Sequence, residues 1–134
     1  QGYRWGNGKL RNSALADTSN KIPGGGLCST VSDLAKLAIA LRGDLLVKPE
    51  TKAQMYRKAR LKNGKTVRYG YGWSLRSYQG RKEVGHSGGQ QRVTTWLYMV
   101  PEKRGAVVIM SNMEGAKLLS LARNIFDIAH PTTD

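Results

Sequence analysis

The segment Gly85-His86-Ser87-Gly88-Gly89 holds the residues of this chain whose types and spacing best fit catalysis. Read as Gly-x-Ser-x-Gly, it matches a nucleophile elbow, in which a strained turn between a strand and a helix exposes the serine for attack on an acyl group. Read as His-Ser-Gly-Gly, it matches a substrate-binding edge strand, in which the serine is not the nucleophile. The two alternatives predict different roles for Ser87.

The sequence on either side of this segment favours the edge strand. An elbow needs a buried apolar strand before the serine and a helix after it. Residues 81–84 are instead mostly polar, and residues 93–100 have the β-branched and aromatic composition of a further strand. Asp127 and His130 follow Ser87 in the order of an elbow triad, but they lie only three residues apart. The acid and the base of such a triad normally come from separate loops, so the elbow is the less favoured alternative.

Four motifs resemble those of the serine β-lactamase and penicillin-binding-protein superfamily, specifically its class C β-lactamase-like branch of esterases and D-amino-peptidases. They are a Gly-Gly-Leu-x-Ser-Thr-x-x-Asp helix start at 23–34, a Tyr-Gly-x-Gly-Trp strand at 69–73, the Gly-His-Ser-Gly-Gly segment at 85–89, and a hairpin strand ending in Asn at 101–112. The resemblance covers nearly the whole chain. It implies hydrolysis of esters, amides, D-amino-acid peptides or β-lactams through a serine acyl-enzyme.

The resemblance also assigns roles to individual residues. His86 takes the place of the lysine in the family's Lys-Thr-Gly box, where an imidazole can donate to the reacting group or set the protonation of a tyrosine base. Ser87 would bind the substrate's carboxylate or carbonyl, and Gly88 would let the substrate backbone approach. Gly89 would supply one of two backbone N–H groups to the oxyanion. Arg92 would reach an anionic substrate group. Because His-Ser-Gly replaces Lys-Thr-Gly, an esterase or peptidase is favoured over a dedicated β-lactamase.

Two further motifs of the family are absent from this sequence. The family's nucleophile lies in Ser-x-x-Lys, where the lysine helps to deprotonate the serine, and its base lies in Tyr-x-Asn or Ser-x-Asn. Neither pattern occurs among the 134 residues, and Thr18-Ser19-Asn20-Lys21 only approximates the first. We therefore expect residues 1–134 to be the C-terminal portion of a larger serine hydrolase domain, with the N-terminal half of that enzyme as its partner.

The composition predicts one globular piece without a metal or an organic cofactor. The chain is 40% hydrophobic, enough to form a core, and has no apolar run near the roughly 20 residues of a membrane span. Cys28 is its single cysteine, and together with His86 and His130 it offers too few ligands for a cysteine–histidine metal site. The resemblance favours a periplasmic or secreted location, and a cytoplasmic one stays open.

The charge of the chain is strongly positive. The 22 Lys and Arg residues against 9 Asp and Glu give a formal net charge of +13, which can attract nucleic acids or anionic surfaces. Basic residues are scattered rather than gathered beside exposed aromatic residues, so we expect a solvated basic surface and no nucleic-acid partner. The densest run, 57–65, has Asn63-Gly64 near its centre and predicts an exposed hairpin or loop tip. Attraction of anionic cell-envelope polymers stays open.

The helices and strands that we expect to position these residues indicate an α+β fold. We expect a helix that begins with a Thr30–Asp33 capping box and ends at Gly43, and a second helix from Pro49 to about Tyr56. The strands are expected at 67–77, 82–85, 91–100 and 106–111, with turns at 79–80 and 103–105. Short connections imply an antiparallel sheet of about three to five strands, and the amphipathic segment 116–129 predicts a C-terminal helix packed on it.

Further expectations concern packing and alternative functions. Residues 1–23 are expected to form a long loop with Tyr3 and Trp5 as packing anchors, and Tyr69, Tyr71 and Trp73 to pack in the sheet. A sheet without its partner layer would expose apolar surface, so self-association as a homodimer stays open. Two other functions also stay open, namely a non-catalytic basic binding module and a self-contained Gly-x-Ser-x-Gly esterase.

Overall fold

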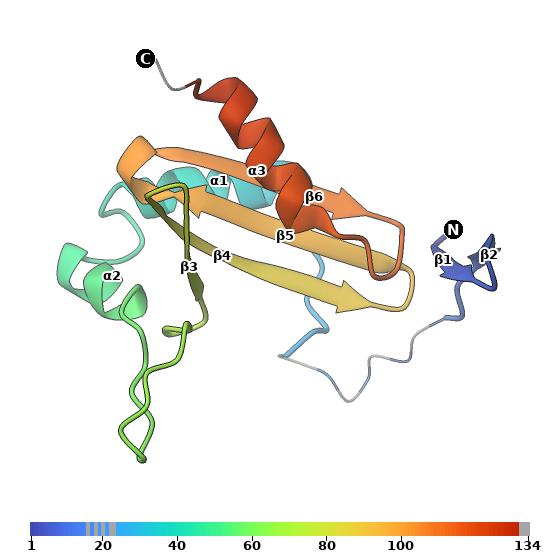
Figure 1. Ribbon diagram of the computed structural model, residues 1–134, viewed down its shortest axis with the longest axis horizontal. Helices are drawn as coiled ribbons and strands as arrows, with labels where there is room; N and C mark the ends of the chain where they lie inside the picture. The colour runs from blue at the N-terminus through green and yellow to red at the C-terminus, as the bar shows by residue number, and fades with distance from the viewer. Residues whose placement is uncertain (16, 18, 20, 22–23, 132–134) are drawn as a thin grey trace.

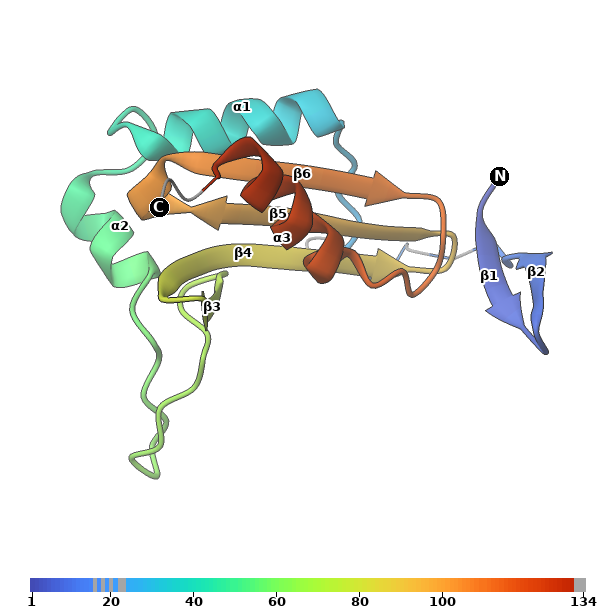
Figure 2. The same ribbon diagram turned by 45° about the horizontal axis from the view of Figure 1, so that its top comes forward.

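The computed structural model, which describes residues 1–15, 17, 19, 21 and 24–131, has the expected α+β architecture. An antiparallel sheet in the order β3-β4-β5-β6 forms its centre, with α1 on one face and α3 across the other (Figures 1 and 2). The elements of this body are α1 Val31–Arg42, α2 Pro49–Met55, β3 Ser74–Tyr78, β4 Arg81–Gln90, β5 Val93–Val100, the 3₁₀ turn η1 Pro101–Lys103, β6 Gly105–Ser111 and α3 Leu118–Ala129.

Two hydrophobic cores lie on the two faces of this sheet, because side chains alternate along each strand. The core on the α1 side contains Ala38, Leu41, Trp73, Leu75, Val84, Leu97 and Met99. The core on the α3 side contains Tyr98, Val100, Ala122 and Phe126. Consecutive residues of β5 therefore serve opposite cores, so the register of this strand fixes both helices on the sheet.

The predicted helix boundaries are largely confirmed by local capping. The Thr30 hydroxyl accepts a hydrogen bond from the Asp33 backbone N–H at 3.1 Å, and Gly43 follows the last residue of α1. Pro49 occupies the first turn of α2, where a missing N–H costs nothing. The C-terminal helix begins at Leu118, two residues later than predicted, and ends at the expected position.

The prediction of a long loop over residues 1–23 is partly wrong. Strands β1 Tyr3–Gly6 and β2 Lys9–Asn12 form a hairpin, and Asn7-Gly8 at its turn has φ values of 52° and 72°. Such an Asn-Gly turn is a strong hairpin signal, but the flanking residues are too polar to look like strands. Tyr3 is an anchor through its backbone, which bonds with Asn112 and Glu114 at 2.7 Å, whereas Trp5 is 66% exposed. Part of the segment up to Pro23 lies outside the described residues.

Two predicted strand boundaries are also wrong. β3 begins at Ser74 instead of 67, because the Gly70 N–H bonds to the Trp73 carbonyl at 2.8 Å and the chain turns there. β4 continues to Gln90 instead of ending at 85. Glycine lowers strand propensity, but pairing with β5 along this whole stretch overrides that local preference.

A buried ion-pair network fastens α3 to the sheet. Glu83 of β4 is 3% exposed, and its carboxylate accepts hydrogen bonds from Arg123 of α3 at 2.6 and 3.0 Å and from the Tyr98 hydroxyl at 2.7 Å. Arg81 donates to the Tyr98 oxygen at 3.1 Å and pairs with Asp127 of α3. Burial raises the pKa of the Tyr98 hydroxyl above its ordinary value, and the hydrogen bond to Glu83 raises this pKa further.

Replacing Glu83 by Gln is expected to destabilise the fold by about 3 kcal/mol, because it removes one partner of a buried ion pair. Glu102→Gln is the matched control, since Glu102 pairs with Lys82 at 3.5 Å with both side chains more than half exposed. That control should change stability by less than about 1 kcal/mol. Urea unfolding monitored by circular dichroism measures both values, and equal losses would show that the buried network does not hold α3.

Candidate functional site

The His-Ser-Gly-Gly segment lies in a part of β4 that has a strand partner on one side only. β3 pairs with β4 from Tyr78–Arg81 to Ser74–Gly85, whereas β5 pairs with β4 as far as Gln90. Figure 2 shows the far half of β4 running on beyond β3 along the border of the sheet. We call the β3 side of residues 86–90 the open edge. An extended ligand can add to such an edge as a further strand.

The backbone groups of Ser87 and Gly89 face this open edge. The two-residue turn after β4 closes on the pair Gln90 and Val93, and such a closing pair exchanges backbone hydrogen bonds. Bonding alternates along an antiparallel ladder, so Ser87 and Gly89 point their N–H and C=O groups away from β5. The two-residue turn between β3 and β4 gives the same alternation. Gly89 thus has a backbone donor that the β4–β5 ladder does not use.

The side chains of His86 and Ser87 lie on opposite faces of the sheet. His86 is opposite Leu97, whose side chain belongs to the core on the α1 side. Ser87 is opposite Trp96, which packs against the core on the α3 side. Both side chains are exposed. The two residues can therefore serve the same ligand only if that ligand lies along the open edge between the faces.

The two glycines that follow Ser87 differ in what requires them. A Cβ on Gly88 would lie 2.4 Å from the Thr95 hydroxyl oxygen, so packing against β5 already explains this glycine. A Cβ on Gly89 would meet nothing within 4 Å. The approach of a substrate to Gly88 stays a prediction, and the space at Gly89 is open to a ligand.

His86 is held by two hydrogen bonds that define the state of its ring. Its Nδ1 lies 2.7 Å from the Ser87 carbonyl oxygen, which only accepts, so Nδ1 carries a proton. Its Nε2 lies 2.8 Å from the Tyr69 hydroxyl, and in the neutral imidazole this nitrogen accepts the hydroxyl proton. Tyr69 was expected to pack in the sheet. Its contact with His86 was missed because the alternating aromatic residues at 69–73 look like a continuous strand, which hides the turn at 70–73. Of the other two aromatic residues that were expected to pack in the sheet, Trp73 is buried and Tyr71 is 69% exposed.

Arg92 lies in the turn between β4 and β5 with φ of 73°. Its Nε donates to the carbonyl oxygens of Ser13 and Ala14 at 3.1 and 3.0 Å. These bonds tie the end of the N-terminal hairpin to the β4–β5 turn. The contact of Arg92 with an anionic substrate group stays a prediction. In this structure Arg92 joins the N-terminal hairpin to the β4–β5 turn.

The structure does not provide the context of a nucleophile elbow. Ser87 lies within a continuous strand, and the next element is β5 rather than a helix. Asp127 is engaged by Arg81, and the His130 ring stacks on Phe126 with 4.3 Å between the ring centroids. His130 also adjoins Gly105, at the end of the sheet away from the open edge. Asp127 and His130 therefore do not form a triad with Ser87.

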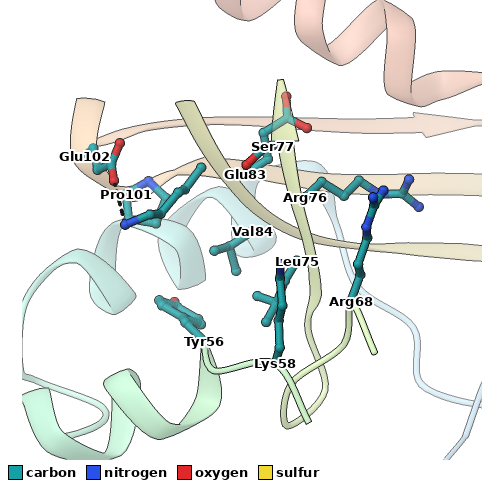
Figure 3. A pocket seen from close by; sticks show the side chains of 11 residues that line it. Tyr56, Lys58, Arg68, Leu75, Arg76, Ser77, Glu83, Val84, Pro101 and Glu102 are labelled. Atoms are coloured by element: carbon teal, nitrogen blue, oxygen red, sulfur yellow. Dashed lines mark ion pairs between the residues drawn. The ribbon is translucent and has the colours of Figure 1, made fainter. Parts of the chain in front are cut away.

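A cavity of about 570 Å³ lies at the other end of β4 (Figure 3). Tyr56, Leu75 and Val84 form its apolar wall, and none of the residues 86–90 lines it. The described residues contain no group of three or more His, Cys, Asp or Glu that could hold a metal ion. Within the same ranges, every helix lacks the combination of length and apolar residues that a membrane crossing requires.

Comparisons with known proteins relate this chain to a protein family and to two individual proteins. The family model described as Beta-lactamase matches residues 1–130. Penicillin-binding protein 4* of Bacillus subtilis (strain 168) is 34% identical over 95 residues, which cover 69% of this chain and 21% of that protein. The octameric penicillin-binding protein homologue from Pyrococcus abyssi aligns with a TM-score of 0.63 at 28% identity, over 75% of this chain and 24% of that one. The chain thus spans about a fifth to a quarter of the length of these relatives.

The hydrogen bonds of His86 predict that its neutral ring carries the proton on Nδ1. Tyr69→Phe removes the donor to Nε2 and should lower the ratio of the Nδ1–H to the Nε2–H form about fivefold, as expected for a hydrogen bond of about 1 kcal/mol. Tyr71→Phe, at an exposed tyrosine next but one along the chain, should leave the ratio unchanged. Long-range ¹H–¹⁵N NMR of the imidazole measures the ratio. A dominant Nε2–H form in the unsubstituted chain would contradict this arrangement.

Proposed function

We propose that this chain, which belongs to the beta-lactamase family, forms the substrate-binding wall of a serine hydrolase that acts through an acyl-enzyme. The observation that carries the proposal is the open edge of β4. Among the described residues, no strand pairs with this edge over residues 86–90, and the backbone of Ser87 and Gly89 faces it. An ester, amide or peptide in extended conformation has the alternating donors and acceptors that such an edge binds.

Gly89 is proposed as one of two donors to the oxyanion. Attack on the substrate carbonyl places negative charge on its oxygen, and a fixed backbone N–H stabilises this charge without reorganising. The Gly89 N–H is supported in this role because it faces away from β5 and the space above the residue is open. The second donor would be the N–H of the nucleophile itself.

The nucleophile is proposed to lie in polypeptide outside this sequence. No Ser-x-x-Lys or Tyr-x-Asn pattern occurs in the 134 residues. Among the described residues, β5 rather than a helix follows the strand of Ser87, and the Ser87 hydroxyl has no hydrogen bond to a base. In this proposal the chain is the C-terminal portion of the enzyme, and its partner half supplies serine, lysine and tyrosine. Ser87 binds the substrate from the open edge, and Arg92 lies beyond it at the β4–β5 turn.

His86 is proposed to favour esters and amides over β-lactams. A lysine at this position would hold a permanent positive charge, which suits a substrate carboxylate. In its neutral form, with Nδ1 donating to the Ser87 carbonyl and Nε2 accepting from Tyr69, His86 carries no such charge. It can instead relay or accept a proton near the reacting group through Tyr69. This chemistry fits an esterase or a D-amino-peptidase.

The oxyanion role of Gly89 predicts a difference between two substitutions in the complete enzyme. Gly89→Ala keeps the N–H and places its Cβ in open space, so kcat/KM should fall less than about tenfold. Gly89→Pro removes the N–H, and kcat/KM should fall about 10²- to 10³-fold. Proline is tolerated where a strand N–H faces away from its partner, and an unchanged circular dichroism spectrum and Tm would verify the fold. Equal activity of the two variants would exclude Gly89 as a donor.

A further inference from the structure

Residues 57–68, which we call the basic arm, project from the body of the molecule as a narrow hairpin (Figures 1 and 2). The arm follows α2 and precedes β3. Backbone hydrogen bonds hold it together, from Leu61 N–H to the Lys65 carbonyl at 2.8 Å and from Val67 N–H to the Ala59 carbonyl at 2.9 Å. Gly64 at its tip has φ of 83°. The hairpin predicted around Asn63-Gly64 is confirmed.

The basic residues are less evenly scattered than expected, because the positive charge of the chain is concentrated around this arm. Residues 51–82 contain ten of the 22 Lys and Arg residues and none of the nine Asp and Glu residues. Six of the ten belong to the arm and are exposed, namely Arg57, Lys58, Arg60, Lys62, Lys65 and Arg68. Within the described part of the chain, none of these six lies within salt-bridge distance of a carboxylate. The rest of the sequence, with twelve basic and nine acidic residues, is close to balance.

An ordered hairpin keeps these like charges close together. The screening length at physiological salt is about 8 Å, so neighbouring side chains of a two-stranded arm repel one another. The backbone bonds of the arm hold the cations in place against this repulsion, and no carboxylate of the arm relieves it. A ligand that brings several negative charges in a row would remove the repulsion and release counterions at the same time.

The positive surface continues from the base of the arm onto the sheet. Lys58 and Arg68 line the cavity of about 570 Å³, together with Arg76 and Lys82. Figure 3 shows the side chains of Arg68 and Arg76 extending to the same side of this cavity. Within the part of the chain that the structure describes, Lys82 is the one of these four cations with a carboxylate partner, which is Glu102. A row of cations from the tip of the arm to β3 fits a long ligand better than a single anion.

We propose that the basic arm binds a linear polymer with repeated phosphate groups and no need for nucleobases. The arm contains no aromatic residue on which a base could stack. Its tip, Lys62-Asn63-Gly64-Lys65, has no apolar side chain, and Leu61 beside the tip is the one large apolar residue that the arm exposes, which is too little to anchor it in a bilayer. Charge alone therefore accounts for its recognition. The residue after the arm, Tyr69, bonds to His86, so the arm is joined to the segment that contacts the open edge.

The experiment measures binding of labelled inorganic polyphosphate to the chain between 50 and 200 mM salt. Four to six phosphate contacts predict a slope of log K against log salt of about −3 to −5. In the arm variant Arg60→Gln/Lys62→Gln/Lys65→Gln, the loss of three contacts should reduce this slope by about 2 to 3 and weaken binding at 50 mM salt at least about tenfold. All three side chains are exposed, and circular dichroism checks that the fold persists.

A control variant with the same net charge separates the arm from the overall charge. Lys9→Gln/Lys103→Gln/Lys117→Gln also removes three exposed cations, and it should weaken polyphosphate binding less than about threefold. Equal weakening by both variants would overturn the arm as the site. Single-stranded DNA or anionic vesicles that bind tenfold more tightly than polyphosphate at matched phosphate concentration would also overturn the proposal, in favour of base stacking or a membrane surface. Because catalysis is not measured, the result is independent of the hydrolase proposed above.

Discussion

The arrangement of the sheet depends on the hydrogen bonds that the buried Glu83 carboxylate accepts. Its burial away from water depends on hydrogen bonds from Arg123 and Tyr98, and these residues come from α3 and β5. A slip of β4 by one residue would turn this carboxylate toward the apolar core on the α1 side. Glu83 therefore fixes the register of β4 three residues before His86. The same register decides that His86 and Ser87 lie on opposite faces.

The open edge arises because β3 is short. The turn at residues 70–73 ends the pairing of this segment with β4 and folds the preceding residues against the outer side of β3, where the Leu75 N–H bonds to the Arg68 carbonyl at 3.0 Å. One local turn thus has two consequences. Among the described residues, it leaves the backbone of Ser87 and Gly89 without a strand on the β3 side, and it brings the Tyr69 hydroxyl to His86. The basic arm is attached to this same segment.

The features that the sequence predicts well are those that depend on neighbours along the chain. The Thr30 cap, Pro49 at a helix start and the amphipathic pattern of α3 are local signals, and the structure has all three. Features that depend on distant partners were missed. β4 extends through a glycine-rich stretch because β5 pairs with it, and Tyr69 reaches His86 through a turn whose position strand-like spacing hides. The candidate residues were identified from their types. The face of the sheet on which each side chain lies could be determined only from the register of β4 with β5.

We propose that Ser87 contacts the substrate and does not attack it. Intact mass spectrometry of the chain after exposure to a fluorophosphonate, which labels activated serines, tests this most directly. We expect no adduct, because Ser87 lies within a strand that β5 follows instead of a helix, and because Asp127 and His130 contact other residues. A stoichiometric adduct mapped to Ser87 would contradict the account and make the chain an esterase in its own right.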